Sequence, residues 1–319
     1  MKTIFLANPR GFCAGVDRAI DIVRKTLEAY PDQPVYVRHE IVHNRHVVQR
    51  LERKGAIFVE TLDEVPDDAV VIFSAHGIPK SVRERAEERG LTHIDATCPL
   101  VTKVHLEARK YYNQGRHIIL IGHEGHPEVE GTMGQVPDNI HLISSSDEID
   151  DLPIDVDQPV AYLTQTTLSV DYTQEIVDDL ENHFDDIVGP SAEDICYATQ
   201  NRQDAVRAMA DQVGFILVIG APNSSNSNRL VEVSRDLGVP AELVQEASEI
   251  DPDWLEDVDS IGLTAGASAP EDLVEEVIEW IDEQYDGAET RRLSVAEEDM
   301  EFNMPDKLKD EEASAAPAS

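Results

Sequence analysis

Short continuous apolar runs alternate along this chain with longer segments in which apolar residues recur at helical spacing. The runs TIFLAN, AVVIFSA, HIILIG, FILVIG and SIGLTAG are rich in Ile, Val and Leu and end in polar residues. Between such runs lie segments such as VDRAIDIVRKTLEAY and QNRQDAVRAMADQV, whose apolar residues recur every three or four positions. Continuous apolar strands that alternate with amphipathic helices are typical of parallel sheets buried on both faces. The pattern therefore predicts an α/β fold.

The alternation repeats in three copies, and each copy contains one cysteine. Cys13, Cys98 and Cys196 each follow a short strand and open a helical segment, and two further strands with polar ends come after each helix. A repeat of this kind indicates similar structural units. We therefore expect three similar small α/β units with parallel sheets, arranged pseudo-threefold around a shared centre. We expect the first unit at residues 1–97, the second at 98–195 and the third at 196–284. Residues 285–319 are expected to form a C-terminal arm with an acidic, disordered tip.

The charge balance is strongly acidic and excludes some classes of partner. The 319 residues are 41% apolar, but 64 acidic residues stand against 26 basic ones, for a net charge of −38. Nucleic acids and anionic membranes need a basic surface, so we expect neither as a partner. We interpret the charge as a heavily hydrated surface of the halophilic type, with an acidic docking face as the alternative.

The apolar runs are too short for membrane or export segments. None approaches the roughly 20 residues that cross a bilayer, and the N-terminal stretch is shorter than the apolar core of a signal peptide. We therefore expect a cytoplasmic protein.

The three cysteines suggest a metal centre. A disulfide framework is not expected for an odd number of cysteines in a chain without an export signal. Each cysteine opens a helix, where free N–H groups and the helix dipole lower the pKa of a thiol. Three converging thiolates suit a cubane cluster that keeps one iron open for substrate. Two alternatives remain open, namely inert buried thiols and a structural zinc, although zinc sites normally contain CxxC pairs and this chain has none.

Polar residues gather where the predicted strands end. These are histidines, hydroxyls and an amide, namely His43, His76, His126, Thr166, Ser224, Ser225, Asn226 and Ser268. In parallel sheets ligands collect at the carboxyl ends of strands, and such side chains beside helix N-termini suit phosphate oxygens. Glu128 follows His126 by two residues in a glycine-rich loop, where it could donate a proton. The alternatives are that NSSNSN is a helix-capping turn and that Glu128 is an ordinary loop carboxylate.

The segment His39–His43 matches the HExxH pattern of zinc proteases. That chemistry needs both histidines on one helical face. The match begins directly after the strand VYVR. We therefore expect His39 to end a strand, the helix to include only His43 onward, and the zinc interpretation to be wrong.

Nine sequence blocks resemble the signature of one enzyme family, the 4-hydroxy-3-methylbut-2-enyl diphosphate reductases. In order they are ANPRGFCAGVDRAI, YVRHEIVHN, FSAHGIP, DATCPLVTKVH, GHEGHPEVEGTMG, TQTTLSV, DICYAT, NSSNSNRL and TAGASAP. They run from about residue 5 to residue 270 without a missing member. The acidic surface and the tail after about residue 300 depart from the family pattern.

The resemblance implies a role for each predicted site residue. Cys13, Cys98 and Cys196 would hold a [4Fe–4S] cluster. Glu128, as proton donor, would form the catalytic group with Thr166, at the hydroxyl end of the substrate, and His126. The residues implied to bind substrate, mostly through its diphosphate, are His43, His76, His126, Thr166, Ser224, Ser225, Asn226 and Ser268.

The implied reaction is the last step of the methylerythritol phosphate route to isoprenoids. It reductively removes the hydroxyl of 4-hydroxy-3-methylbut-2-enyl diphosphate and gives isopentenyl and dimethylallyl diphosphates. The implied electron donor is ferredoxin, flavodoxin or a similar small carrier. The alternatives are a redox-neutral iron–sulfur hydro-lyase and a non-enzymatic redox sensor, of which the sensor would not need so many polar residues at strand ends.

Overall fold

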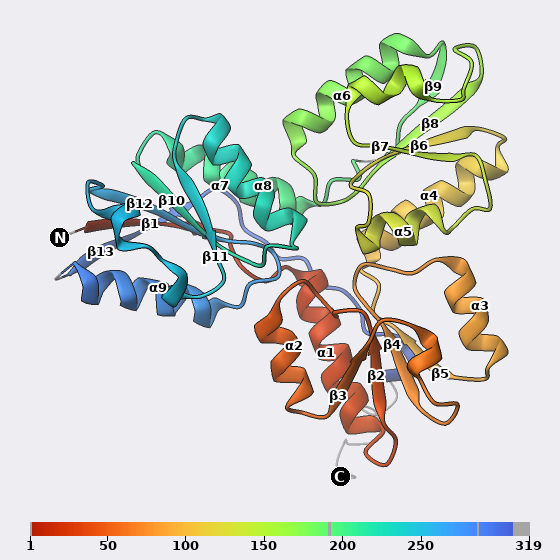
Figure 1. Cartoon of the computed structure of the whole chain (residues 1–319), viewed down its shortest axis with the longest axis horizontal. Coiled ribbons are helices and arrows are strands. Elements are labelled where there is room, and N and C mark those ends of the chain that lie inside the picture. Colours follow the sequence, from red (N-terminus) through yellow and green to blue (C-terminus); the bar gives the residue numbers. More distant parts are fainter. Residues whose placement is uncertain (1, 191–192, 286, 309–319) are drawn as a thin grey trace, which may run out of the picture.

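The protein consists of three α/β units around a common centre (Figure 1). The computed structural model describes residues 2–190, 193–285 and 287–308. Each unit has one parallel sheet with helices packed on it. The predicted α/β fold with three similar units is thus confirmed. No helix in the described ranges is long and apolar enough to cross a bilayer.

The first unit has a four-stranded sheet in the order β3-β2-β4-β5. Its strands are β2 (Val35–Arg38), β3 (Ala56–Val59), β4 (Val70–Phe73) and β5 (Thr92–Asp95). Its helices are α1 (Ala14–Ala29), α2 (Arg45–Glu52) and α3 (Lys80–Glu88), with the 3-10 turn η1 (Leu62–Glu64). All four residues of β4 are buried, as expected for a central parallel strand that helices cover on both faces.

The second unit repeats this order as β7-β6-β8-β9. Its strands are β6 (His117–Ile121), β7 (Ile140–Ile143), β8 (Pro159–Thr164) and β9 (Asp186–Val188). Its helices are α4 (Pro99–Asn113), α5 (Pro127–Met133) and α6 (Val170–His183), with η2 (Ser146–Asp151).

The third unit has the five-stranded sheet β11-β10-β12-β1-β13. Its strands are β1 (Lys2–Asn8), β10 (Phe215–Ile219), β11 (Ala241–Val244), β12 (Ser260–Ala265) and β13 (Ala288–Ser294). Its helices are α7 (Tyr197–Ala210), α8 (Ser225–Asp236) and α9 (Glu271–Gln284), with η3 (Ala247–Glu249) and η4 (Pro252–Leu255). A last 3-10 turn, η5, spans Asp306–Leu308.

One predicted division differs from the structure. Residues 1–97 were expected to form the first unit, but β1 pairs in parallel with β12 and β13 and so belongs to the sheet of the third unit. There it takes the place that β5 and β9 take in the other two sheets. The expected arm 285–319 also contains a sheet strand, β13. Its expected disordered tip falls mostly on residues 309–319, which lie outside the described ranges.

Because β1 belongs to the sheet of the third unit, every cysteine lies at a junction between two units. β1, β5 and β9 are the strands that precede the three cysteines, and α1, α4 and α7 are the helices that follow. β5 and β9 each form the edge of one unit's sheet, and β1 lies one strand in from the edge of the third sheet. Each of the three helices packs on the core of the next unit. The chain therefore crosses from unit to unit at Cys13, Cys98 and Cys196, which brings all three to the centre.

Candidate active site

A cavity of about 110 Å³ lies where the three units meet. All twelve residues predicted for the site contribute to its lining. They are Cys13, His43, His76, Cys98, His126, Glu128, Thr166, Cys196, Ser224, Ser225, Asn226 and Ser268. The site thus collects residues that lie more than 250 positions apart in the chain, because the carboxyl ends of all three sheets point to one centre.

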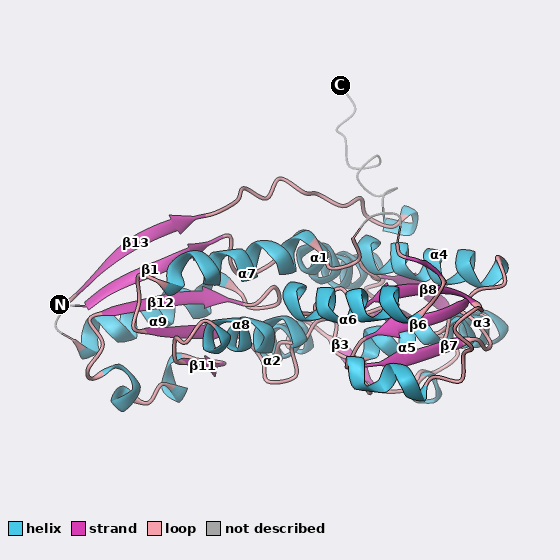
Figure 2. Ribbon diagram, turned by 90° about the horizontal axis from the view of Figure 1, so that it is seen from above, coloured by secondary structure: helices cyan, strands magenta, loops and turns pink. Residues whose placement is uncertain are grey.

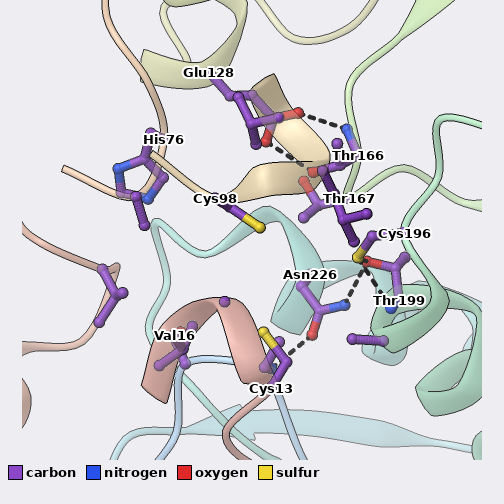
Figure 3. Close-up of a pocket in the computed structure, with 18 of the residues that line it drawn as sticks. Cys13, Val16, His76, Cys98, Glu128, Thr166, Thr167, Cys196, Thr199 and Asn226 are labelled. Atoms are coloured by element: carbon purple, nitrogen blue, oxygen red, sulfur yellow. Dashed lines mark hydrogen bonds between the residues drawn. The ribbon is translucent and has the colours of Figure 1, made fainter. Parts of the chain in front are cut away.

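Each cysteine occupies the N-cap position of its helix, immediately before α1, α4 and α7. Figure 3 shows the three sulfur atoms bordering one space. Gly15 in α1 makes room for two of them. A Cβ on Gly15 would lie 2.8 Å from the Cys98 Sγ and 3.8 Å from the Cys13 Sγ. The Cys196 Sγ accepts a hydrogen bond from the Thr199 N–H at 3.4 Å and lies 3.2 Å from the Thr199 Oγ1.

The thiol pKa values contradict the sequence prediction. Burial raises the pKa of Cys98 to about 12 and that of Cys196 to about 11, and it also raises the pKa of Cys13. Helix-start N–H groups do lower the pKa of each thiol, as predicted, but the loss of solvation outweighs them. The thiolate forms would therefore need a positive centre in the cavity, such as a bound metal.

The donor set fits an iron–sulfur cluster with an open position. Three soft sulfur ligands face one cavity, and all three cysteines of the chain are used. Within the described ranges, no group of three or more His, Cys, Asp or Glu side chains surrounds a single metal-ion position. The residues that could hold a cluster are therefore Cys13, Cys98 and Cys196, with the fourth direction left to the polar side of the cavity.

Three histidines form a compact group on that polar side. The rings of His43 and His76 stack with centroids 4.1 Å apart, and His126 meets them edge-on at 5.3 and 5.9 Å. Burial, followed by the neighbouring histidines, lowers the pKa of His76 well below 6.5 and that of His126 to about 3. These two rings are therefore neutral at neutral pH and can each donate one hydrogen bond.

The hydrogen bonds of the histidines show which ring nitrogens are free to bind a ligand. The His126 Nδ1 accepts the Glu128 N–H at 3.2 Å, so the ring proton is on Nε2. The His43 Nδ1 lies 3.3 Å from Glu40 and from Asn223, whereas the buried Nε2 of His43 has no hydrogen-bond partner among the described residues. A buried, unpartnered nitrogen in a cavity wall indicates a polar ligand, because leaving it unpaired is costly.

The third unit contributes hydroxyls and an amide from the start of α8 and the end of β12. Ser224 caps α8 and accepts the Ser227 N–H at 3.4 Å. The Asn226 Oδ1 accepts the Ala267 N–H at 2.8 Å, and its Nδ2 donates to Thr199 Oγ1 at 3.3 Å. The capping turn and the cavity wall are thus the same structure, and the two interpretations of NSSNSN do not exclude each other.

Two serines of this group link the third unit to its neighbours. The Ser225 hydroxyl donates to the Thr167 carbonyl of the second unit at 3.1 Å. The Ser268 hydroxyl donates to the His43 carbonyl of the first unit at 2.9 Å. The polar wall therefore depends on all three units being docked.

Glu128 is buried at the start of α5 and is held by Thr166. One carboxylate oxygen accepts the Thr166 N–H at 2.6 Å, and the other accepts the Thr166 hydroxyl at 3.0 Å (Figure 3). Burial raises the pKa of Glu128 to about 7, although both hydrogen bonds oppose the shift. The carboxyl is therefore poised to hold or release a proton near neutral pH.

The HExxH match does not form a metal site. His39 directly follows β2 with a left-handed φ of 59°, and its Nδ1 lies 2.6 Å from Glu60. α2 begins only at Arg45, because the Asn44 side chain caps it by accepting the His46 and Val47 N–H groups. Neither histidine is helical, so the expectation that the helix would include His43 is wrong, and the expectation of a false zinc match is supported.

The cavity has lining residues that the sequence analysis missed. Thr167 follows Thr166, and Thr199 lies in the first turn after Cys196, so proximity to a predicted residue could have found both. Tyr197 directly follows Cys196, and its hydroxyl accepts the Ala14 N–H at 3.4 Å. Phe302 comes from the C-terminal arm, where no motif marks it.

Comparisons with known proteins agree on one family. The family model described as LytB protein matches residues 4–282. A protein of Burkholderia pseudomallei named 4-hydroxy-3-methylbut-2-enyl diphosphate reductase is 57% identical over 305 residues, covering 96% of this chain and 97% of the relative. A Zymomonas mobilis protein of the same name is 54% identical over 309 residues, covering 97% and 90%. The solved structure of the E-1-hydroxy-2-methyl-but-2-enyl-4-diphosphate reductase from Plasmodium falciparum is 37% identical, with a TM-score of 0.93 over 98% of each chain.

Proposed function

Since the chain belongs to the LytB protein family, we propose that it reduces 4-hydroxy-3-methylbut-2-enyl diphosphate to isopentenyl and dimethylallyl diphosphates, the last step of the methylerythritol phosphate route. One observation carries the proposal. Three cysteines from three unit junctions border a cavity whose other walls hold Glu128 and a set of neutral hydrogen-bond donors. This arrangement would bring a redox centre, a proton donor and a diphosphate-binding wall together in one cavity.

In the proposal Cys13, Cys98 and Cys196 hold a [4Fe–4S] cluster. When bound, the cluster supplies two electrons, one at a time, together with a Lewis-acid iron. The three thiols line the same cavity. Since their pKa values are high without a metal, loading the site releases their protons.

The diphosphate is bound by the polar wall of the cavity. His43, His76 and His126 offer ring N–H groups, and the hydroxyls and amide of Ser224, Ser225, Asn226 and Ser268 add further donors. The N-terminus of α8 also points its free N–H groups and positive dipole end at this wall. Anchoring the non-reacting end in this way orients the allylic hydroxyl toward the sulfurs.

Glu128 acts as the proton donor, with Thr166 as its positioning partner. Because burial brings its pKa to about 7, Glu128 is largely protonated in slightly acidic solution and about half protonated at neutral pH. It can then deliver a proton to the departing hydroxyl, which leaves as water, and the allylic fragment gains a second proton to form either product. The Thr166 hydroxyl donates to the Glu128 carboxylate and so fixes the carboxyl plane.

The electrons come from outside the chain. A small carrier such as ferredoxin or flavodoxin in the cytoplasm is the proposed donor. A requirement for a reductant separates this function from a redox-neutral hydro-lyase, which would release water from a substrate without electrons.

The test is anaerobic purification followed by iron and sulfide analysis, a visible spectrum and turnover with reduced methyl viologen. Wild type should contain iron and acid-labile sulfide and should convert the substrate only when the reductant is present. Cys98→Ser should lose the spectrum and the turnover together. Water loss without reductant would show a hydro-lyase, and a loaded chain that never turns over would indicate a redox sensor.

A further inference from the structure

The segment that follows β13 crosses from the third unit to the first. Residues 295–308, here named the strap, leave the sheet edge at Val295, whose N–H donates to the Asn8 carbonyl at 2.9 Å. Figure 2 shows the strap running along one face of the molecule toward α1. It ends with Leu308, which is only 4% exposed in the core of the first unit, where Met304 also packs. The strap is therefore anchored at both ends.

Between its anchors the strap contributes a wall to the cavity. Phe302 lines the cavity together with Cys13 and Cys98. Among the described residues beyond 285, it is the one that does so. Its neighbour two positions earlier, Met300, is 46% exposed and is not in the lining. The Phe302 side chain is thus part of the cavity wall, whereas Met300 is not.

The strap also reaches the cysteine loops through a buried arginine. Arg202 of α7 is fully buried, and its guanidinium donates to the Gly11 carbonyl at 2.7 Å and to the Ala198 carbonyl at 2.8 Å. Glu298 of the strap accepts from the same guanidinium at 3.0 Å. Gly11 and Ala198 lie two residues from Cys13 and Cys196. A buried guanidinium is tolerated only while it is paired, so Glu298 keeps this link in place.

A second arginine links the strap to the remaining cysteine. The Arg18 Nε donates to the Asn303 carbonyl of the strap at 2.8 Å, and its Nη1 donates to the Thr97 carbonyl at 3.1 Å. Thr97 directly precedes Cys98. The strap is therefore hydrogen-bonded, through Arg202 and Arg18, to backbone next to all three cysteines.

We propose that the strap seals the metal-binding side of the cavity, with Phe302 as the covering wall and Glu298 as a positioning residue for the Cys13 loop. This inference rests on the proposed function, because it assigns the strap to the iron–sulfur site. Closure keeps small oxidants, chelators and water from the sulfur ligands. It also requires the third unit to be docked on the first, since the strap joins them.

The wall is tested with Phe302→Ala, the bulk-conserving Phe302→Leu and the exposed control Met300→Ala. The anaerobic holoenzyme is mixed with the iron chelator bipyridyl, and the decay of the cluster spectrum is timed. We expect Phe302→Ala to decay about tenfold faster than wild type, equivalent to about 1.4 kcal/mol in the closing equilibrium. Phe302→Leu and Met300→Ala should decay at the wild-type rate. Equal rates for Phe302→Ala and Met300→Ala would overturn the inference.

A second readout does not need the cluster. In the full-length chain stripped of iron, the three cysteines are labelled with N-ethylmaleimide, and mass spectrometry gives a rate for each. Phe302→Ala should speed labelling of Cys13, Cys98 and Cys196, which line the same cavity as Phe302. If wild type purified without oxygen contains no iron, the proposed function is refuted. If Phe302→Ala leaves the labelling rates unchanged, the sealing role of the strap is refuted.

Glu298 is tested against its exposed neighbour. Glu298→Gln removes the charge that pairs with Arg202, and Glu297→Gln removes an equal charge at an exposed position of the strap. We expect faster labelling of Cys13 and faster cluster decay in the first variant only, with melting temperature followed as a check on folding. If Glu297→Gln has the same effect, the overall charge of the strap and not the Glu298–Arg202 contact controls access to the cysteines. That result would refute the positioning role of Glu298.

Discussion

Glu128 illustrates how one buried side chain combines structure and chemistry. Both carboxylate oxygens accept hydrogen bonds from Thr166, which favours the ionised form, yet burial dominates and brings the pKa to about 7. A carboxyl with this pKa can take up a proton from solvent at neutral pH and release it during a reaction. An exposed glutamate on the same helix, such as Glu130, lacks these partners.

We predict that Glu128→Gln lowers turnover at least about 100-fold, because an amide cannot donate the proton as an acid does. The amide keeps the size of the side chain, and its oxygen can still accept the Thr166 N–H, while its NH2 can donate to the Thr166 hydroxyl in place of accepting from it. The iron content and the substrate dissociation constant should stay close to wild type. Glu130→Gln is the matched control and should retain turnover. Undiminished turnover in Glu128→Gln would return that residue to an ordinary structural role.

The histidine group predicts proton uptake on substrate binding. Burial holds the pKa of His76 and His126 far below neutral, so these two rings are uncharged at neutral pH in the free site. A bound diphosphate favours the charged imidazolium and raises these pKa values. The complex then holds more protons than the free protein, so affinity should increase as pH falls toward the raised values.

Calorimetry of substrate binding in two buffers with different ionisation enthalpies measures this uptake. We expect a net uptake that decreases in His76→Asn, which removes one titrating ring. Proton release, or equal heats in both buffers, would show that the rings stay neutral in the complex.

At the scale of elements, the helix starts decide where the sulfurs meet. α1 begins at Ala14, and Gly15 in its first turn faces the Cys98 sulfur from the neighbouring unit. In an isolated helix, replacing glycine by alanine is favourable by roughly 1 kcal/mol. Here the added Cβ would approach the Cys98 Sγ to 2.8 Å, which is too close without a shift of the sulfur.

Gly15→Ala therefore separates helix stability from metal-site geometry. We expect the iron-free variant to fold with an unchanged or slightly raised melting temperature, because the thiol can rotate. Its iron and sulfide content after anaerobic reconstitution should fall well below that of wild type. Full reconstitution would mean that the two sulfurs have more freedom than their approach to Gly15 indicates.

At the scale of the whole molecule, the acidic charge should make the protein dependent on salt. The net charge of −38 is visible in exposed acidic positions along α9, which include Glu275, Glu276 and Glu279. At ~0.1 M salt the screening length is about 10 Å, so neighbouring carboxylates repel one another; at ~1 M it is about 3 Å. The repulsion opposes the compact state and the approach of an anionic substrate.

We predict that the melting temperature rises with potassium chloride from about 0.1 to about 1 M, the range in which the screening length shortens. A variant with Glu275, Glu276 and Glu279 all changed to Gln should melt higher than wild type at low salt and show a smaller salt slope. A flat or falling melting temperature in wild type would refute the halophilic interpretation and leave the proposed reaction untouched.

Local sequence patterns were enough to predict the α/β class, the three repeated units and the kinds of residue at the centre. These follow from local patterns, since apolar periodicity defines strands and helices, and polar residues after parallel strands collect at one edge of a sheet. A cysteine between each strand and helix sufficed to locate the three thiols at helix starts. The resemblance in ordered motifs then predicted which side chains share a site.

The features that depend on long-range strand pairing and on burial could be read only from the folded chain. Strand β1 completes the sheet of the third unit, not the first, because strand pairing across more than 250 residues leaves no trace in local periodicity. Burial reversed the predicted direction of the thiol pKa values, since desolvation depends on what surrounds a group in three dimensions. Phe302 joined the cavity for the same reason: an ordinary residue in an acidic tail becomes part of a site only when the chain folds back across it.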